Sequence, residues 1–169
     1  MLKYNCRILS LDERRKVMEL LLVHITDIHI NNEEDYQKLD VRSEYIANAI
    51  NKHIIVANDT IVVLCITGDI AYSGSEEQYL WASIIITNII ENIKKRHNGV
   101  HIQVVTVPGN HDCDFERRDN KVRESLLKDS TLDMLNVDIV EACTTAQNTY
   151  FDFVKEWDNS IVFMLISYD

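Results

Sequence analysis

Two carboxylates, two imidazoles and one amide lie in three short polar segments, and proteins build sites for divalent metal ions from such side chains. Asp27 and His29 are two residues apart, so both side chains point to the same side if the chain there is extended. Asp69 stands in the second segment, and Asn110 and His111 stand together in the third. A mixture of carboxylate, imidazole and amide oxygen suits manganese, iron or zinc better than metals that prefer thiolates.

Each polar segment follows an apolar run that is typical of a buried strand. The three runs cover residues 21–26, 61–67 and 101–107. Apolar residues at helical spacing over 33–55 and over 75–97 predict one helix between each pair of strands. This alternation predicts an α/β fold with a mainly parallel sheet, in which the carboxyl ends of the strands meet at one edge. We therefore expect the three polar segments to lie side by side.

The remainder of the chain shows weaker patterns. Residues 10–19 are predicted as a short helix, 114–158 as a mostly helical insertion, and 161–167 as a last strand. The 169 residues have the length of one domain. Because the expected last strand is apolar and nothing follows to cover it, we expect 1–169 to be the N-terminal portion of a longer protein.

Charge and composition limit the classes of partner and compartment. There are 17 Lys and Arg against 27 Asp and Glu, a formal net charge of −10, which argues against binding nucleic acid by bulk electrostatics. A phosphate substrate is still compatible with this charge if bound metal ions neutralise it. The 4 cysteines show no paired short spacing, and no apolar run approaches the length of a membrane span. We therefore expect a cytoplasmic protein with no membrane partner.

Each polar segment taken alone has a simpler explanation in turn chemistry. Aspartate after glycine is common in turns at strand ends, and glycine followed by asparagine suits a type II turn or the N-terminal cap of a helix. The occurrence of all three segments at successive strand ends favours a metal site over three unrelated turns.

The three segments also resemble motifs of a known family. Asp-Ile-His at 27–29, Gly-Asp at 68–69 and Gly-Asn-His-Asp at 109–112 are similar to the first three motifs of the calcineurin-like metallophosphoesterase superfamily. Within it, the stretches ITGDIAYSG and VPGNHD resemble the bacterial cyclic-nucleotide phosphodiesterase-type members. The resemblance implies an α/β/β/α sandwich, with a sheet flanked by helices, of which this chain supplies about half.

The resemblance further implies a centre of two divalent ions, which would be manganese, iron or zinc. It places Asp27 and His29 on one ion and Asn110 on the other, with Asp69 shared by both. Two ions about 3.5–4 Å apart need such a shared carboxylate, and together they can activate water at neutral pH.

By the same resemblance, His111 faces the phosphoryl group of the substrate and Asp112 orients the imidazole. Hydrolysis of a phosphate ester requires a proton donor for the leaving alkoxide, a role that suits His111. A carboxylate beside the imidazole, here Asp112, would fix its orientation. The implied function is metal-dependent hydrolysis of phosphomono- or phosphodiesters, with a cyclic nucleotide or small diester favoured over nucleic acid as substrate. Protein phosphatases of the superfamily carry Asp-Arg-Gly after the Gly-Asp motif, where this chain has Tyr72-Ser73-Gly74, so a protein substrate is not favoured.

Part of the family pattern is missing from the sequence. The family continues with a further histidine and a Gly-His-x-His motif, whereas His111 is the last of the six histidines in this chain. Two alternatives therefore stay open, namely a non-catalytic regulatory or interaction module on the same fold and a nuclease of the same superfamily. Among the other histidines, His24 is an odd number of residues from Asp27, so we expect it to face away from the site into the core.

Overall fold

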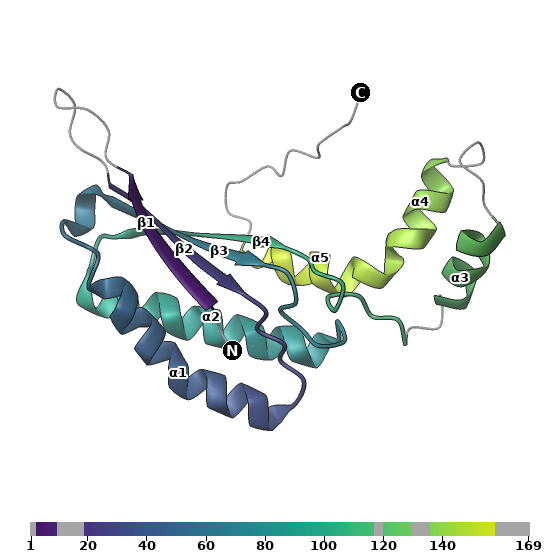
Figure 1. The fold of residues 1–169 in the computed structure, drawn as a ribbon, viewed down its shortest axis with the longest axis horizontal. Coiled ribbons are helices and arrows are strands. Elements are labelled where there is room, and N and C mark those ends of the chain that lie inside the picture. The colour runs from purple at the N-terminus through teal and green to yellow at the C-terminus, as the bar shows by residue number, and fades with distance from the viewer. Residues whose placement is uncertain (1–2, 10–18, 117–119, 130–135, 158–169) are drawn as a thin grey trace.

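The structure is a computed structural model that describes residues 3–9, 19–116, 120–129 and 136–157. Its sheet has the strand order β1-β2-β3-β4 (Figure 1). Strands β2, β3 and β4 are parallel, and β1 pairs with β2 in the antiparallel direction. The predicted α/β class and the three predicted strands are confirmed. The four strands span Lys3–Leu9, Glu19–Thr26, Thr60–Thr67 and His101–Val107.

The edge strand β1 is absent from the predicted element order. The sequence does carry a signal for it, because apolar residues alternate with Lys, Asn and Arg over these seven positions. What makes the segment a strand is its antiparallel pairing with β2, the next strand along the chain, and a seven-residue pattern alone does not specify that partner. The predicted helix over 10–19 is wrong at Glu19, which begins β2, and its other residues lie outside the described part of the chain.

Two long helices connect the parallel strands and lie side by side on one face of the sheet (Figure 1). They are α1 (Glu33–Asn51) and α2 (Glu76–Arg96), so both predicted helices are confirmed, although α1 ends earlier than expected. The side-chain oxygens of Asn32 and Ser75 cap the first turns by accepting backbone N–H bonds. A single 3-10 turn, Ala57–Asp59, leads from α1 into β3.

Among the described residues, three further helices follow β4 in the stretch that the sequence predicts as mostly helical. They are α3 (Asn120–Asp129), α4 (Val137–Thr144) and α5 (Asn148–Lys155), and the 3-10 turn Thr145–Gln147 joins the last two. The insertion itself stays a prediction, because the strand expected at 161–167 lies outside the described residues. No helix in the described ranges is long and apolar enough to cross a bilayer.

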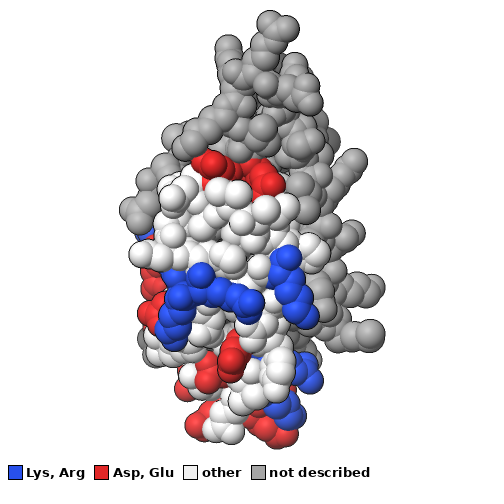
Figure 2. Space-filling model, turned by 90° about the vertical axis from the view of Figure 1, so that its left-hand side faces the viewer, with Lys and Arg blue, Asp and Glu red and all other residues white. Residues whose placement is uncertain are grey.

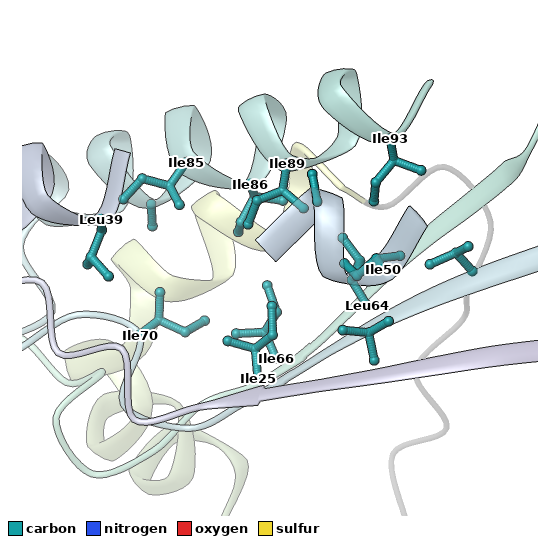
Figure 3. Close-up of a cluster of buried hydrophobic side chains, with 14 of the residues drawn as sticks. Ile25, Leu39, Ile50, Leu64, Ile66, Ile70, Ile85, Ile86, Ile89 and Ile93 are labelled. Atoms are coloured by element: carbon teal, nitrogen blue, oxygen red, sulfur yellow. The ribbon is translucent and has the colours of Figure 1, made fainter. Parts of the chain in front are cut away.

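The hydrophobic core fills the space between the sheet and the two long helices (Figure 3). Alternate residues of β2 and β3 point into it, which is the pattern of a strand with one face covered. Each fully buried aliphatic side chain contributes about 1.5–3 kcal/mol. The packing therefore fixes the carboxyl ends of the strands relative to one another. The core side chains labelled in Figure 3 are Ile25, Leu39, Ile50, Leu64, Ile66, Ile70, Ile85, Ile86, Ile89 and Ile93.

The opposite face of the sheet carries the other set of alternating side chains. His24 lies on that face and is exposed, with Nε2 at 2.5 Å from Oγ1 of Thr67. The expectation that His24 packs in the core is therefore wrong. The physical reason is that the neighbouring Ile25 points toward the helices, and successive residues of a strand point to opposite faces.

Positive side chains gather at the end of the molecule where the long helices finish. Figure 2 shows this end, with Lys and Arg side chains across its middle and acidic side chains above and below. The last turn of α2 supplies Lys94, Lys95 and Arg96, whose charge suits the negative end of the helix dipole. These cations lie at the amino ends of the parallel strands. They are thus remote from the carboxyl ends, where the polar motif residues are.

Candidate metal centre

Three candidate ligands share an unusual backbone conformation. Asp27, His29 and Asp69 have φ values of 56°, 51° and 53°, and they are the described non-glycine residues with positive φ. The left-handed region costs a non-glycine residue about 1–2 kcal/mol. Asp27 and His29 are therefore not in the extended conformation that the sequence predicts. Their own left-handed backbone, just past the end of β2, brings them together. Such strain is concentrated at functional sites of proteins.

The loops after β2 and β3 are joined by backbone hydrogen bonds. The N–H of His29 donates to the carbonyl of Asp69 at 2.9 Å, and the N–H of Ile30 donates to the carbonyl of Ile70 at 3.1 Å. The N–H of Tyr72 returns a bond to the carbonyl of Ile30 at 3.1 Å. The parallel pairing of the two strands thus continues beyond their ends. It holds the first two motif loops in register.

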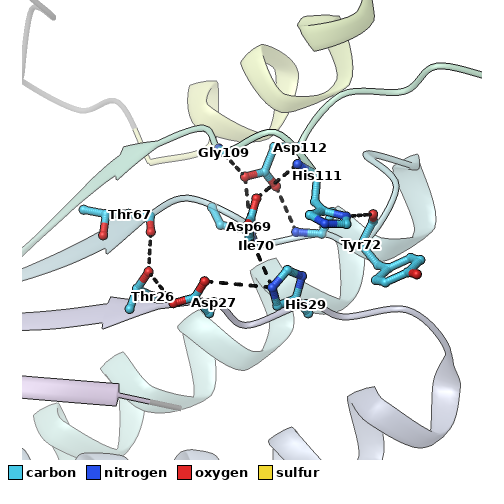
Figure 4. A network of polar contacts seen from close by, with 11 residues as sticks. Thr26, Asp27, His29, Thr67, Asp69, Ile70, Tyr72, Gly109, His111 and Asp112 are labelled. Carbon is cyan, nitrogen blue, oxygen red and sulfur yellow. Dashed lines mark hydrogen bonds and ion pairs between the residues drawn. The ribbon is translucent and has the colours of Figure 1, made fainter. Parts of the chain in front are cut away.

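The imidazole of His29 lies between two carboxylates (Figure 4). Its Nε2 is 3.9 Å from Oδ1 of Asp27 and 3.8 Å from Oδ2 of Asp69. Both separations are too long for hydrogen bonds. Two ligand atoms that each lie about 2.1 Å from one ion are at most about 4.2 Å apart, so these separations are compatible with a shared cation.

Three of the motif side chains form a compact group. Ligand atoms of His29, Asp69 and His111 all lie within 4.8 Å of one another. Asp27 is at the rim, where its side chain is 55% exposed and accepts a bond from the Thr26 hydroxyl at 3.1 Å. The group combines nitrogen and oxygen donors in the manner of Mn, Fe and Zn sites.

One polar atom of the group is buried without a protein partner. Nδ1 of His29 has no hydrogen bond within the described residues, while Nε2 faces the carboxylates. Leaving a buried donor or acceptor unpaired costs about 1–3 kcal/mol. Nε2, which faces both carboxylates without a hydrogen bond to either, is the atom placed to bind an ion together with them. The residues present therefore fit a divalent metal at this position.

Gly109 allows the third loop to approach Asp69. A Cβ atom at position 109 would collide with the Asp69 carboxylate and would lie 2.5 Å from its backbone nitrogen. Glycine is therefore the residue that fits between the β3 and β4 loops. The close approach also lets the backbone N–H of His111 donate to Oδ1 of Asp69 at 3.1 Å. The β4 loop thus fixes the direction of the central carboxylate.

Asp112 is fully buried and joins the two loops through its carboxylate. Oδ2 accepts bonds from the N–H groups of Gly109 at 2.8 Å and Ile70 at 3.2 Å. Oδ1 accepts bonds from the N–H of Ala71 at 2.9 Å and the hydroxyl of Tyr79 at 3.0 Å. Each oxygen thus has two donors. The exposed fraction of Asp112 is 0%, so its described contacts are those of a structural clamp.

His111 is oriented by a backbone carbonyl. Its Nδ1 lies 2.8 Å from the carbonyl oxygen of Tyr72, and since a carbonyl only accepts, Nδ1 must carry the hydrogen. In the neutral ring, Nε2 is then unprotonated and available to a proton or a metal ion. The orienting contact predicted for Asp112 is thus made by Tyr72.

Asn110 is exposed in the loop between Gly109 and His111. It lies next to the compact group in sequence, and its assignment to a second ion stays a prediction.

Two aromatic residues near the site are not identified as functional by the motifs. The ring of Tyr72 is 48% exposed and its centroid lies 5.2 Å from that of His111. Tyr79 of α2 contacts Asp112, and no motif in the sequence singles it out.

Two tyrosines beneath the β4 loop have perturbed acidity. Burial, followed by the nearby Asp112 carboxylate, raises the pKa of Tyr79 well above its usual range. Burial also raises the pKa of Tyr150 to about 12, although its hydrogen bond with Thr106 acts in the opposite direction. Tyr150 of α5 lies 2.8 Å from the Thr106 hydroxyl, and its ring meets that of Tyr79 edge to face. Both hydroxyls are therefore kept in the neutral form.

Comparisons with known proteins bear on this site. A family model described as calcineurin-like phosphoesterase matches residues 20–161, a stretch that includes all three motif loops. A protein of Acanthamoeba polyphaga mimivirus, described as uncharacterized, is 32% identical over 113 residues. That stretch is 65% of this chain but 8% of the viral protein, so the chain spans a small part of this relative. No solved structure matches the chain.

Proposed function

Because the chain belongs to the calcineurin-like phosphoesterase family, we propose that it hydrolyses phosphate esters at a centre of two divalent metal ions. The observation that carries the proposal is the grouping of His29, Asp69 and His111 within 4.8 Å at three successive strand ends. The strained backbone of Asp69 and His29 supports the same conclusion, because such strain is concentrated at functional sites of proteins.

Four residues would hold the ions. Asp27, His29 and Asp69 would bind the first ion, and Asp69 and Asn110 would bind the second. Bound divalent ions would supply charge neutralisation for the phosphoryl group and an activated water at neutral pH. Metal ions as the source of positive charge also agree with the net charge of −10. The Lys and Arg side chains of α2 lie at the far end of the sheet, away from the phosphoryl group.

His111 would serve as the proton donor to the leaving alkoxide. Its Nδ1–H is held by the Tyr72 carbonyl, so Nε2 is the atom that would carry the transferred proton. The Tyr72 carbonyl fixes the direction of the imidazole, and the hydrogen bond from the backbone N–H of His111 to Asp69 fixes the main chain that carries it. Asp112 would act indirectly by holding the loop that carries His111.

The favoured substrate is a cyclic nucleotide or another small diester with a planar group. The half-exposed ring of Tyr72 stands beside His111 and offers a stacking surface to such a group. Nucleic acid is less favoured, since a chain with net charge −10 would repel a long phosphate backbone. As parts of the same proposal, the chain is similar to bacterial cyclic-nucleotide phosphodiesterases and is located in the cytoplasm.

Hydrolysis of bis-p-nitrophenyl phosphate in the presence of Mn(II) tests the proposal. Asp69→Asn should abolish both hydrolysis and Mn(II) binding, because it removes the charge that both ions would share. Asp152→Asn is the matched control, since this carboxylate is exposed on α5 and pairs with Lys155. Hydrolysis that survives chelation or Asp69→Asn would exclude the mechanism. A chain that binds no Mn(II) would instead favour the non-catalytic alternative.

A further inference from the structure

The first turns of α2 reach the motif loops from beneath. Gln78 donates to the carbonyl of Asn31 at 3.2 Å and accepts from the N–H of Ser73 at 2.9 Å. The next residue, Tyr79, places its hydroxyl 3.0 Å from Oδ1 of Asp112 and 3.3 Å from the carbonyl oxygen of the same residue. This helix is thus bonded to the loops after all three parallel strands.

The Asp112 carboxylate connects the loops that carry Asp69 and His111. Oδ2 binds one N–H from each loop, and Oδ1 binds one loop N–H together with the Tyr79 hydroxyl. Three of the four donors therefore belong to the loops being held. The fourth donor, Tyr79, comes from a helix that is anchored in the core, so it fixes the clamp relative to the rest of the fold.

The position of Tyr79 is itself fixed by packing. Its side chain is 3% exposed, and its ring stacks on Phe153 of α5 with centroids 5.0 Å apart. The tyrosine cannot turn its hydroxyl away from Asp112 without moving α5. A displacement of the hydroxyl is therefore transmitted to the carboxylate and, through it, to the loops on either side.

From these contacts we infer that Tyr79 is a positioning residue for the metal centre, which sets the spacing between the Asp69 loop and the His111 loop through the Asp112 carboxylate. The inference rests on the proposed metal site. Its consequence is local: without the hydroxyl, Oδ1 keeps one donor, and the Ala71 and Ile70 amides lose the fixed partner that holds the β3 loop. A group that bonds a metal ligand directly is typically worth about 10- to 100-fold in metal affinity, and because Tyr79 acts one contact further out, the lower end of that range is expected.

The test compares Tyr79→Phe with Tyr150→Phe. Both variants remove one buried hydroxyl from the same aromatic cluster, and Tyr150 is 2% exposed. The Tyr150 hydroxyl bonds Thr106 rather than Asp112, so the second variant reproduces the loss of stability without the loss of the clamp. Mn(II) affinity of the 169-residue chain is measured by calorimetric titration, and amide exchange is measured at Ile70 and Ala71 without metal.

We expect Tyr79→Phe to bind Mn(II) about 10-fold more weakly than wild type and to exchange the Ile70 and Ala71 amides faster. Tyr150→Phe should match wild type in both measurements, even where its melting temperature is lowered. Equal Mn(II) affinity in Tyr79→Phe and wild type would overturn the inference and leave the proposed function standing. So would an equal loss in both variants, or a Tyr79→Phe chain that does not fold while Tyr150→Phe does. A wild-type chain that binds no Mn(II) would reject the proposed function itself.

Discussion

The backbone N–H of His111 donates a hydrogen bond to Oδ1 of Asp69 at 3.1 Å, so the loop after β4 aims the carboxylate that stands after β3. The other oxygen, Oδ2, faces Nε2 of His29 at 3.8 Å. Asp69 is thus in contact with both neighbouring strand ends. A residue in this position is suited to be shared between two ions.

Mn(II) should bind to the chain in two unequal steps. The first ion would have three protein ligands, Asp27, His29 and Asp69, whereas the second would have only Asp69 and the neutral Asn110. In calorimetric titration, Asn110→Ala should remove the weaker step and leave the stronger one. His29→Ala should weaken the stronger step by about 100-fold or more, since even outer partners of a metal are worth about 10- to 100-fold. Two tight and equivalent sites would show that further ligands are present.

His111→Ala separates the role of proton donor from that of ligand. A general acid typically contributes about 10²- to 10⁴-fold to the rate, so kcat for bis-p-nitrophenyl phosphate should fall within that range. Mn(II) affinity should stay close to that of wild type. A large fall in affinity would instead assign Nε2 of His111 to an ion, an outcome that its closeness to His29 and Asp69 makes worth measuring.

Gly109→Ala should disturb the centre by steric means alone. The added Cβ would lie 2.5 Å from the Asp69 backbone nitrogen, and overpacking of this kind costs about 1–3 kcal/mol. Unfolding by urea gives the stability, and titration gives the Mn(II) affinity, which should also fall. Gly99→Ala is the control, because φ at Gly99 is +97° and the substitution strains the backbone at the opposite end of the sheet. That variant should lose stability and keep its Mn(II) affinity.

Tyr72→Leu should change substrate preference while leaving the centre intact. The substitution removes the exposed ring and keeps the backbone carbonyl that orients His111. Base stacking on an aromatic residue is worth about 1–3 kcal/mol, so KM for cyclic AMP should rise about 5-fold or more with little change in kcat. Tyr45→Leu, at an exposed tyrosine of α1, should leave KM unchanged. A KM that does not respond to Tyr72→Leu would remove the support for a planar substrate.

Stability should fall in alkaline solution through the buried tyrosines. The pKa of Tyr150 is raised to about 12 in the folded chain, compared with 10.0 for a free tyrosine. Above about pH 10 the unfolded chain therefore binds fewer protons than the folded chain, and the free energy of unfolding decreases as the pH rises toward 12. Urea unfolding at pH 9, 10 and 11 measures this slope. Tyr150→Phe should make this slope shallower, whereas an unchanged slope would show that groups other than Tyr150 cause the fall in the free energy of unfolding.

The sequence by itself was sufficient to predict the alternation of strands and helices. Apolar runs and helical spacing are local patterns, and they predict β2, β3, β4, α1 and α2 because each of these elements buries one face along its own length. The same order of elements predicts that the three polar segments meet at one edge of a parallel sheet, as they do. The strand β1, by contrast, is established by its antiparallel pairing with β2, which the alternating pattern over Lys3–Leu9 leaves undecided.

The arrangement inside the site was decided by tertiary structure. Asp27 and His29 approach each other through left-handed backbone rather than through an extended strand, because the loops after β2 and β3 are bonded to one another. Asp112 bonds backbone amides, and since nearly every residue has an amide, no pattern in the sequence can show which ones a carboxylate will meet. Tyr79 likewise gains its role only where α2 passes beneath the β4 loop, a contact set by packing of the whole core.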